Sequence, residues 1–162
     1  MLASFAASAR TVRLAAALMG ALALGACAKD QNADGFGAGG AATPGSAQDF
    51  VVNVGDRVFF ETDSTDLTPT AVATLDKQSA WLQRYPRYTF TIEGHADERG
   101  TREYNLALGD RRANSSKNYL VTRGVNAARI NTISYGKERP LATGSDEASW
   151  AQNRRAVTVT LQ

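Results

Sequence analysis

The chain has 162 residues, with 18 lysines and arginines against 16 aspartates and glutamates, and its formal net charge is +2 at pH 7. Residues 1–26 hold two of the arginines and no acidic residue, so the remainder is formally neutral and has no electrostatic reason to bind nucleic acid. One histidine and one cysteine are too few for a zinc site, and no metal or cofactor is expected.

The N-terminal segment has the features of an export signal. Arg10 and Arg13 precede 11 apolar residues (14–24), which are too few to span a bilayer at about 1.5 Å per residue. The sequence LGAC at residues 24–27 resembles the lipobox of bacterial lipoproteins. This resemblance implies that residues 1–26 are removed and that Cys27 carries lipid. For a lone cysteine the alternative is a free thiol or half of an intermolecular disulfide.

Residues 27–47 are predicted to form a lipidated cysteine followed by a flexible linker. The stretch 28–47 is rich in glycine and alanine, and Phe36 is its one large apolar residue, so it cannot bury enough surface to fold. A flexible coil of this length averages about 25 Å from end to end. The linker therefore predicts a domain that acts at some distance from its anchor.

The remaining 115 residues (48–162) are enough for one modest domain. Residues 57–61 read as a strand. Thr68 and Pro69 are an N-cap and a first helical residue, and the helix they open ends near Tyr85, before Pro86. Residues 88–94 alternate apolar and polar side chains, which is typical of a half-buried strand.

A second helix is expected over residues 104–123, ended by Gly124, and two further strands over 129–136 and 155–162. A short helix is expected at residues 147–152. The order β-α-β-α-β-β predicts an α/β two-layer sandwich, in which two main helices cover one face of a mixed four-stranded sheet.

Arg112 lies on the inward stripe of the second helix. Residues at helical spacing on that stripe include Asn105, Leu108 and Gly109, whereas Arg111 lies toward solvent. A buried guanidinium without acceptors is too costly to persist, so Arg112 needs partners. Side chains lean toward the helix N-terminus, which directs Arg112 toward the loop that carries Asp97.

Two interpretations of this pair stay open. Asp97 and Arg112 could form a structural ion pair. Alternatively they could face a ligand such as the zwitterionic head of an amino acid, with Asp97 accepting from the ammonium and Arg112 clasping the carboxylate.

The segment GHADERGTREYNLALGDRRANSSKNYL (residues 94–120) resembles the peptidoglycan-binding motif of OmpA-like domains, in particular those of the peptidoglycan-associated lipoproteins of the Tol-Pal system. The segments VFFETDSTDL (58–67), ISYGKERP (133–140) and SWAQNRR (149–155) resemble the same family. The resemblance covers nearly all of residues 48–162.

This resemblance implies a function and a site. The expected ligand is the diaminopimelate of peptidoglycan stem peptides, bound by Asp97 of the motif G-H-x-D and by Arg112 of L-x-x-x-R-A, which begins at Leu108. Asn105 is the expected supporting residue, and Thr62 and Asp63 match the loop after the first strand.

The resemblance also implies partners and a location. It points to a lipoprotein that faces the periplasm from the outer membrane, since Ala28 follows the lipidated cysteine. Expected partners are peptidoglycan, TolB and other Tol-Pal components, and the expected roles are envelope integrity and outer-membrane constriction during cell division. A module that binds only proteins is the competing hypothesis.

An enzyme is not expected. His95 has no second histidine beside it, and no nucleophile framework such as G-x-S-x-G is present. His95 is expected to brace its loop, with ligand contact as the alternative. The same choice between structural and ligand roles applies to Arg154 and Arg155.

Overall fold

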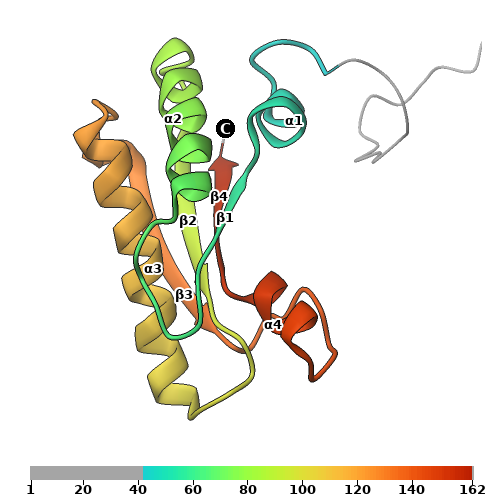
Figure 1. Ribbon diagram of the computed structural model, residues 1–162. Helices are drawn as coiled ribbons and strands as arrows, with labels where there is room; N and C mark the ends of the chain where they lie inside the picture. Colours follow the sequence, from blue (N-terminus) through green and yellow to red (C-terminus); the bar gives the residue numbers. More distant parts are fainter. Residues whose placement is uncertain (1–41, 162) are drawn as a thin grey trace, which may run out of the picture. The chain divides into compact units, whose positions relative to one another are not determined.

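The computed structural model describes residues 42–161 of the chain (Figure 1). The signal sequence, Cys27 and most of the predicted linker lie outside these residues. In chain order the elements are α1 (Ala47–Asp49), the π-helix η1 (Phe50–Val54), β1 (Arg57–Phe59), α2 (Pro69–Arg84), β2 (Thr89–His95), α3 (Arg102–Thr122), the 3-10 helix η2 (Ala127–Arg129), β3 (Ile130–Gly136), α4 (Glu147–Asn153) and β4 (Arg155–Leu161).

The sheet is mixed, as predicted, and its strand order is β1-β4-β2-β3. Strands β2 and β3 run parallel, and β4 is antiparallel to both β1 and β2. Helices α2 and α3 cover one face of the sheet (Figure 1), which confirms the predicted α/β sandwich. The C-terminal strand thus lies in the middle of the sheet, between the first two strands of the chain.

Local signals predicted most elements closely. Thr68 caps α2 by accepting a hydrogen bond from the amide of Ala71, and Pro69 opens the helix as expected. Helix α3 starts two residues before its predicted start, at Arg102, because Thr101 caps it in the same way. The first strand is shorter than predicted and ends at Phe59.

The N-terminal elements α1 and η1 were not predicted, because residues 47–54 show no clear helical periodicity. They are held by long-range contacts: Phe50 is fully buried against Trp81, and the Trp81 indole donates to Asp49. Gly45, which the sequence placed in the linker, accepts hydrogen bonds from Arg87 and Tyr88. The chain therefore joins the domain beside the start of β2.

Helix α3 approaches the sheet very closely at one point. A side chain on Gly94 of β2 would overlap the backbone carbonyl of Gly109 of α3, and one on Gly109 would meet Ser134 of β3. Only glycines permit this contact. It fixes the height of α3 above the end of β2, where the residues of the G-H-x-D motif leave the sheet.

Candidate functional site

A small cavity lies beyond the C-terminal end of β2, where His95 is the last residue of the strand. Its volume is about 300 Å³, near the lower end of the range for small-molecule sites. Its wall comes from the loop after β1, the loop between β2 and α3, and the first two turns of α3. The lining residues are Thr62, Asp63, Asp97, Arg99, Gly100, Tyr104, Asn105 and Leu108.

Asp97 is the buried acid of this cavity, with 7% of its surface exposed. Its Oδ1 accepts from the backbone amide and the Nε of Arg99, both at 3.1 Å, and its Oδ2 accepts from the Arg99 Nη2 at 2.7 Å. Arg154 Nη1 lies 3.5 Å from the same Oδ2. Burial acts to raise the Asp97 pKa, but the bonds from Arg99 and Arg154 prevail and hold it below the ordinary value. The carboxylate is therefore ionised and already occupied by a cation.

Arg112 does not line the cavity. It is fully buried, and its three nitrogens donate to backbone carbonyls: Nε to Ser64, Nη1 to His95 and Nη2 to Glu61, at 2.9, 2.9 and 3.1 Å. Burial lowers its pKa to about 10, so the guanidinium stays charged at neutral pH. Arg112 thus ties together the loop after β1 and the end of β2, which form two sides of the cavity.

These contacts differ from the structural ion pair of Asp97 and Arg112 that was one of the two interpretations. Among residues 42–161 the ion pairs of Asp97 are with Arg99 and Arg154. The prediction that Arg112 needs acceptors is confirmed, but the acceptors are carbonyls, whose positions carry no signal in the sequence. The three bonds to carbonyls use three of the five N–H donors of the guanidinium, so the clasp of a ligand carboxylate by Arg112 stays a prediction.

The loop after β1 contributes the second acid of the cavity. Asp63 has φ of 53°, the only positive φ of a non-glycine residue in the described range, and the Tyr104 hydroxyl donates to its Oδ1. A residue held in this conformation at a cavity wall is typical of a ligand site. The bond from Tyr104 to Asp63 raises the Tyr104 pKa, so the hydroxyl keeps its proton and remains a donor.

The structure brings five of the six predicted ligand residues to one cavity: Thr62, Asp63, Asp97, Asn105 and Leu108. Three more lining residues were missed, namely Arg99, Gly100 and Tyr104. Arg99 gave one usable signal, a cation two residues after the motif acid. Tyr104 lies next to Asn105 in the first turns of α3 and was assigned no role.

A family model described as the OmpA family matches residues 59–154, which include every residue of the cavity. The chain belongs to the OmpA family. A protein of Rhizobium meliloti (strain 1021) named peptidoglycan-associated lipoprotein is 63% identical over 148 residues, covering 88% of this chain and 84% of that protein. The protein of that name in Pseudomonas aeruginosa is 50% identical over 127 residues, covering 78% and 74%.

Solved structures agree with this assignment. The peptidoglycan-associated lipoprotein of Burkholderia pseudomallei has a TM-score of 0.67 and 40% identity, covering 72% of this chain and all of that one. The C-terminal domain of Helicobacter pylori MotB has a TM-score of 0.62 at 21% identity, covering 66% and 84%, and shares the fold alone. The relatives named peptidoglycan-associated lipoprotein confirm the predicted family. The prediction that the chain is not an enzyme agrees with that name, which is the name of a lipoprotein.

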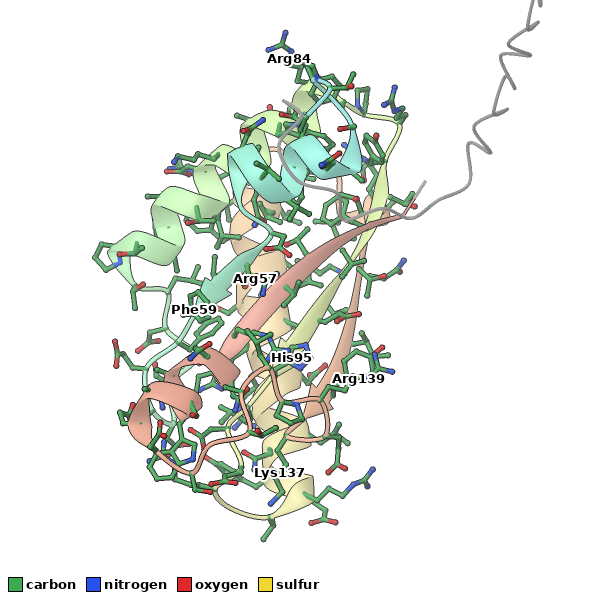
Figure 2. The ribbon with its side chains drawn as sticks, turned by 90° about the vertical axis from the view of Figure 1, so that its right-hand side faces the viewer. Arg57, Phe59, Arg84, His95, Lys137 and Arg139 are labelled. Atoms are coloured by element: carbon green, nitrogen blue, oxygen red, sulfur yellow. The ribbon has the colours of Figure 1, made fainter. Side chains whose placement is uncertain are left out.

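The His95 ring of this OmpA domain does not line the cavity. It lies on the side of the sheet turned away from α3, packed 5.6 Å from the Tyr135 ring and 2% exposed (Figure 2). Neither ring nitrogen has a hydrogen-bond partner among the described residues. Its backbone carbonyl, in contrast, accepts from Arg112. His95 therefore supports the site through its backbone, in agreement with the predicted bracing role.

His95 is expected to make stability depend on pH. Burial, with the charges of Arg155 and Arg139, lowers its pKa from 6.5 to about 4, although Glu93 Oε2 lies 3.6 Å from the ring. A base with a depressed folded pKa binds more protons when unfolded, so stability is lost as pH falls from about 6.5 to 4, by about 2–3 kcal/mol. Urea unfolding across this window measures it. The His95→Gln variant should show a flatter profile, and an unchanged profile contradicts the assignment.

Arg154 and Arg155, at the start of β4, make structural contacts in this OmpA domain. Arg154 is 4% exposed and donates to the Phe60 carbonyl at 3.0 Å and to Glu147 Oε1 at 2.6 Å. Arg155 donates to the carbonyls of Asn153 and Arg139. Arg154 also lies beside Asp97, so it connects α4 to the cavity.

Across residues 42–161, no group of three or more His, Cys, Asp or Glu side chains lies close enough to hold a metal ion. No helix in the same range combines the length and apolar character needed to cross a bilayer.

Proposed function

We propose that this OmpA domain binds peptidoglycan through the diaminopimelate of its stem peptides. One observation carries the proposal: the cavity wall combines two carboxylates and one guanidinium, with a second guanidinium buried behind it. The four charges sum to zero. A zwitterionic group, with one ammonium and one carboxylate close together, matches such a wall in charge and in size.

In this mechanism Asp97 accepts hydrogen bonds from the ligand ammonium, which takes the place of the Arg99 side chain. The Arg99 guanidinium is partly exposed and lies over the Trp150 ring, 4.2 Å from its centroid, so it has a second resting place. Once released from Asp97 it can meet the ligand carboxylate. This exchange of partners preserves the charge balance of the cavity.

Arg112 positions the cavity rather than closing on the ligand. Its bonds to Glu61, Ser64 and His95 hold both loops in place. Its charge, in a site of low dielectric, adds a favourable potential for the ligand carboxylate. Asn105 supports the opposite loop, since its Nδ2 donates to the Arg99 carbonyl at 2.7 Å.

The decisive experiment compares peptidoglycans of different stem-peptide chemistry. Co-sedimentation of the purified domain should show retention on diaminopimelate-containing peptidoglycan and much weaker retention on the lysine-containing form, which lacks the carboxylate. A tripeptide in which the free amine of diaminopimelate is acetylated should compete poorly. Equal retention on the two peptidoglycans would contradict the proposal that diaminopimelate is the bound group.

Binding of this kind is modest in affinity, because each charged hydrogen bond contributes about 1.5–3 kcal/mol net. Modest affinity suffices when many copies are held near one lattice. The chain enters the domain beside the start of β2, and the cavity lies past its end, about 20 Å away along seven residues. A tether at one end of the domain and a binding cavity at the other suit a protein that links a membrane to peptidoglycan.

The proposal therefore includes a lipid anchor at Cys27 in the outer membrane, facing the periplasm, with residues 28–47 as the tether. It rests on the lipobox and on relatives named lipoproteins. It also includes membership in the Tol-Pal system, with roles in envelope integrity and cell division and with TolB as a partner at the peptidoglycan face. Purified TolB should then compete with peptidoglycan for the domain, and simultaneous binding of both contradicts a shared surface.

The Cys27→Ser variant should not incorporate labelled palmitate and should fractionate away from the outer membrane, because lipid needs the thiol. Each buried methylene contributes about 0.8 kcal/mol, so losing several acyl chains removes nearly all membrane affinity. Palmitate labelling of cells that express either form measures this. Incorporation into the serine variant contradicts the anchor.

A further inference from the structure

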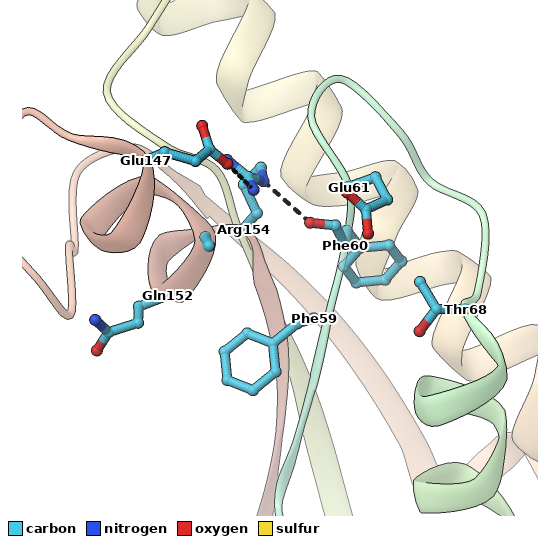
Figure 3. Close-up of a pocket in the computed structure, with 8 residues that line it drawn as sticks. Phe59, Phe60, Glu61, Thr68, Glu147, Gln152 and Arg154 are labelled. Carbon is cyan, nitrogen blue, oxygen red and sulfur yellow. Dashed lines mark hydrogen bonds and ion pairs between the residues drawn. The ribbon is translucent and has the colours of Figure 1, made fainter.

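A second hollow lies beside the cavity, between β1, the loop that follows it, and α4 (Figure 3). Its volume is about 510 Å³. The exposed ring of Phe59 forms one side, and Gln152 and Glu147 of α4 form another. Glu61 and Thr68 complete the polar rim. The proposed binding of diaminopimelate uses none of these side chains.

Phe59 is an aromatic residue at an outward-facing position of β1. Its neighbours in sequence, Val58 and Phe60, are each 3% exposed, whereas Phe59 is 44% exposed at the edge of the sheet. The face of an aromatic ring carries partial negative charge and attracts C–H groups, which makes it a platform for flat, amphipathic ligands. Hydroxyl and amide groups around such a ring can form hydrogen bonds with the polar edge of a ligand that stacks on the ring.

The charge of the hollow narrows the ligand class. Glu147 is paired with Arg154, so these two charges cancel, and the carboxylate of exposed Glu61 leaves the wall negative. This disfavours the carboxylate-rich stem peptide. An uncharged ligand with hydroxyl groups and an apolar ring face fits better, and sugars have this chemistry.

The two sites adjoin. Glu61 lines the hollow and the next residue, Thr62, lines the cavity. Arg154 lies between them, bonded to Glu147 on one side and 3.5 Å from Asp97 on the other. The cavity and the hollow are therefore close enough for one extended ligand to reach both.

We infer that the hollow is a glycan subsite, which takes the N-acetylated sugar carried by the stem peptide whose diaminopimelate fills the cavity. The inference rests on the proposed function. Three residues of peptide span at most about 10–11 Å, enough to cross the width of one arginine side chain. The apolar face of the sugar stacks on Phe59, and its hydroxyl and acetamido groups meet Gln152 and Glu61.

The test compares two ligands on the purified domain by calorimetry: a tripeptide ending in diaminopimelate, and the same tripeptide attached to its disaccharide. The natural domain should bind the disaccharide form more tightly. The Phe59→Leu variant, which keeps apolar area but lacks a ring, should lose about three- to tenfold of affinity for that form. Its affinity for the bare tripeptide should not change.

The Phe59→Tyr variant keeps the ring and should retain the sugar-dependent gain. Leu141→Ala serves as a control, since Leu141 is also exposed and does not line the hollow. Equal affinity of the natural domain for both ligands overturns the inference and leaves diaminopimelate binding intact. If Phe59→Leu keeps the full gain in affinity for the disaccharide form, the inference is overturned too. Failure of both ligands to bind removes the proposed function, and the glycan subsite with it.

Discussion

The Arg112→Ala variant is expected to lose peptidoglycan retention and about 3–5 kcal/mol of unfolding free energy. The substitution leaves the carbonyls of Glu61, Ser64 and His95 without their donor, and it opens a void beneath Phe60, whose ring lies 5.2 Å from the guanidinium carbon. With the three carbonyls released, the two loops of the cavity no longer hold their spacing. Urea unfolding measures the first effect, and co-sedimentation at a temperature where the variant is folded measures the second.

Two further variants separate charge from position. Arg111→Ala changes the neighbouring exposed residue of α3 and should alter neither quantity. Arg112→Lys keeps the charge, but one ammonium cannot reach three carbonyls in the geometry of a guanidinium. It should therefore remain impaired in both assays. If Arg112→Lys retains full peptidoglycan binding, the charge alone matters. If Arg112→Ala is as stable as the wild-type domain, the bonds of Arg112 to the three carbonyls do not hold the loops.

The Asp97→Asn variant should reduce affinity for the diaminopimelate tripeptide by about ten- to a hundredfold, because the ligand ammonium loses its charged acceptor. Stability should change by about 1 kcal/mol or less, since the ion pair with Arg99 is partly exposed and screened, and Arg154 keeps its bonds to Glu147 and to the Phe60 carbonyl. Asn also removes the cost of burying a charge. Calorimetry with the tripeptide gives the affinity, and Asp66→Asn, in the exposed part of the loop after β1, is the matched control.

The lowered pKa of Asp97 predicts how both stability and affinity for the tripeptide depend on pH. The folded pKa of Asp97 lies below its ordinary value of 3.8, so the stabilisation it provides is present above about pH 4 and is lost only as pH falls through the lower folded value. Affinity of the natural domain should be steady from pH 7 to 5. A loss of affinity near pH 6 in both the natural domain and Asp97→Asn would point to another group.

The elements with strong local signals were predicted closely from the sequence. Helix α2 has an N-cap, a proline at its first position and a proline beyond its end, and strand β2 alternates cleanly. Helix α1 and η1 lack such signals and form because Phe50 packs against Trp81, 31 positions further along the chain. Their existence depends on a partner that no local window contains.

The candidate site divides in the same way. The resemblance named Asp97, Asn105, Leu108, Thr62 and Asp63, and the structure gathers them at one cavity. Arg99 was missed because a loop residue has no periodicity to reveal its direction. The acceptors of Arg112 could not be predicted, since they are backbone carbonyls and every residue has one.

The sequence by itself determined the family, the α/β class, the burial of Arg112 and the chemistry available near Asp97, because these follow from residue types and their local spacing. The tertiary structure decided that Arg112 holds the loops, that Arg99 occupies Asp97, and that Phe59 borders a second hollow. The bonds of Arg112 join residues up to 51 positions apart. Which carbonyl or side chain meets a given guanidinium depends on how the strands are ordered and how closely α3 approaches Gly94, and these are properties of the packed domain.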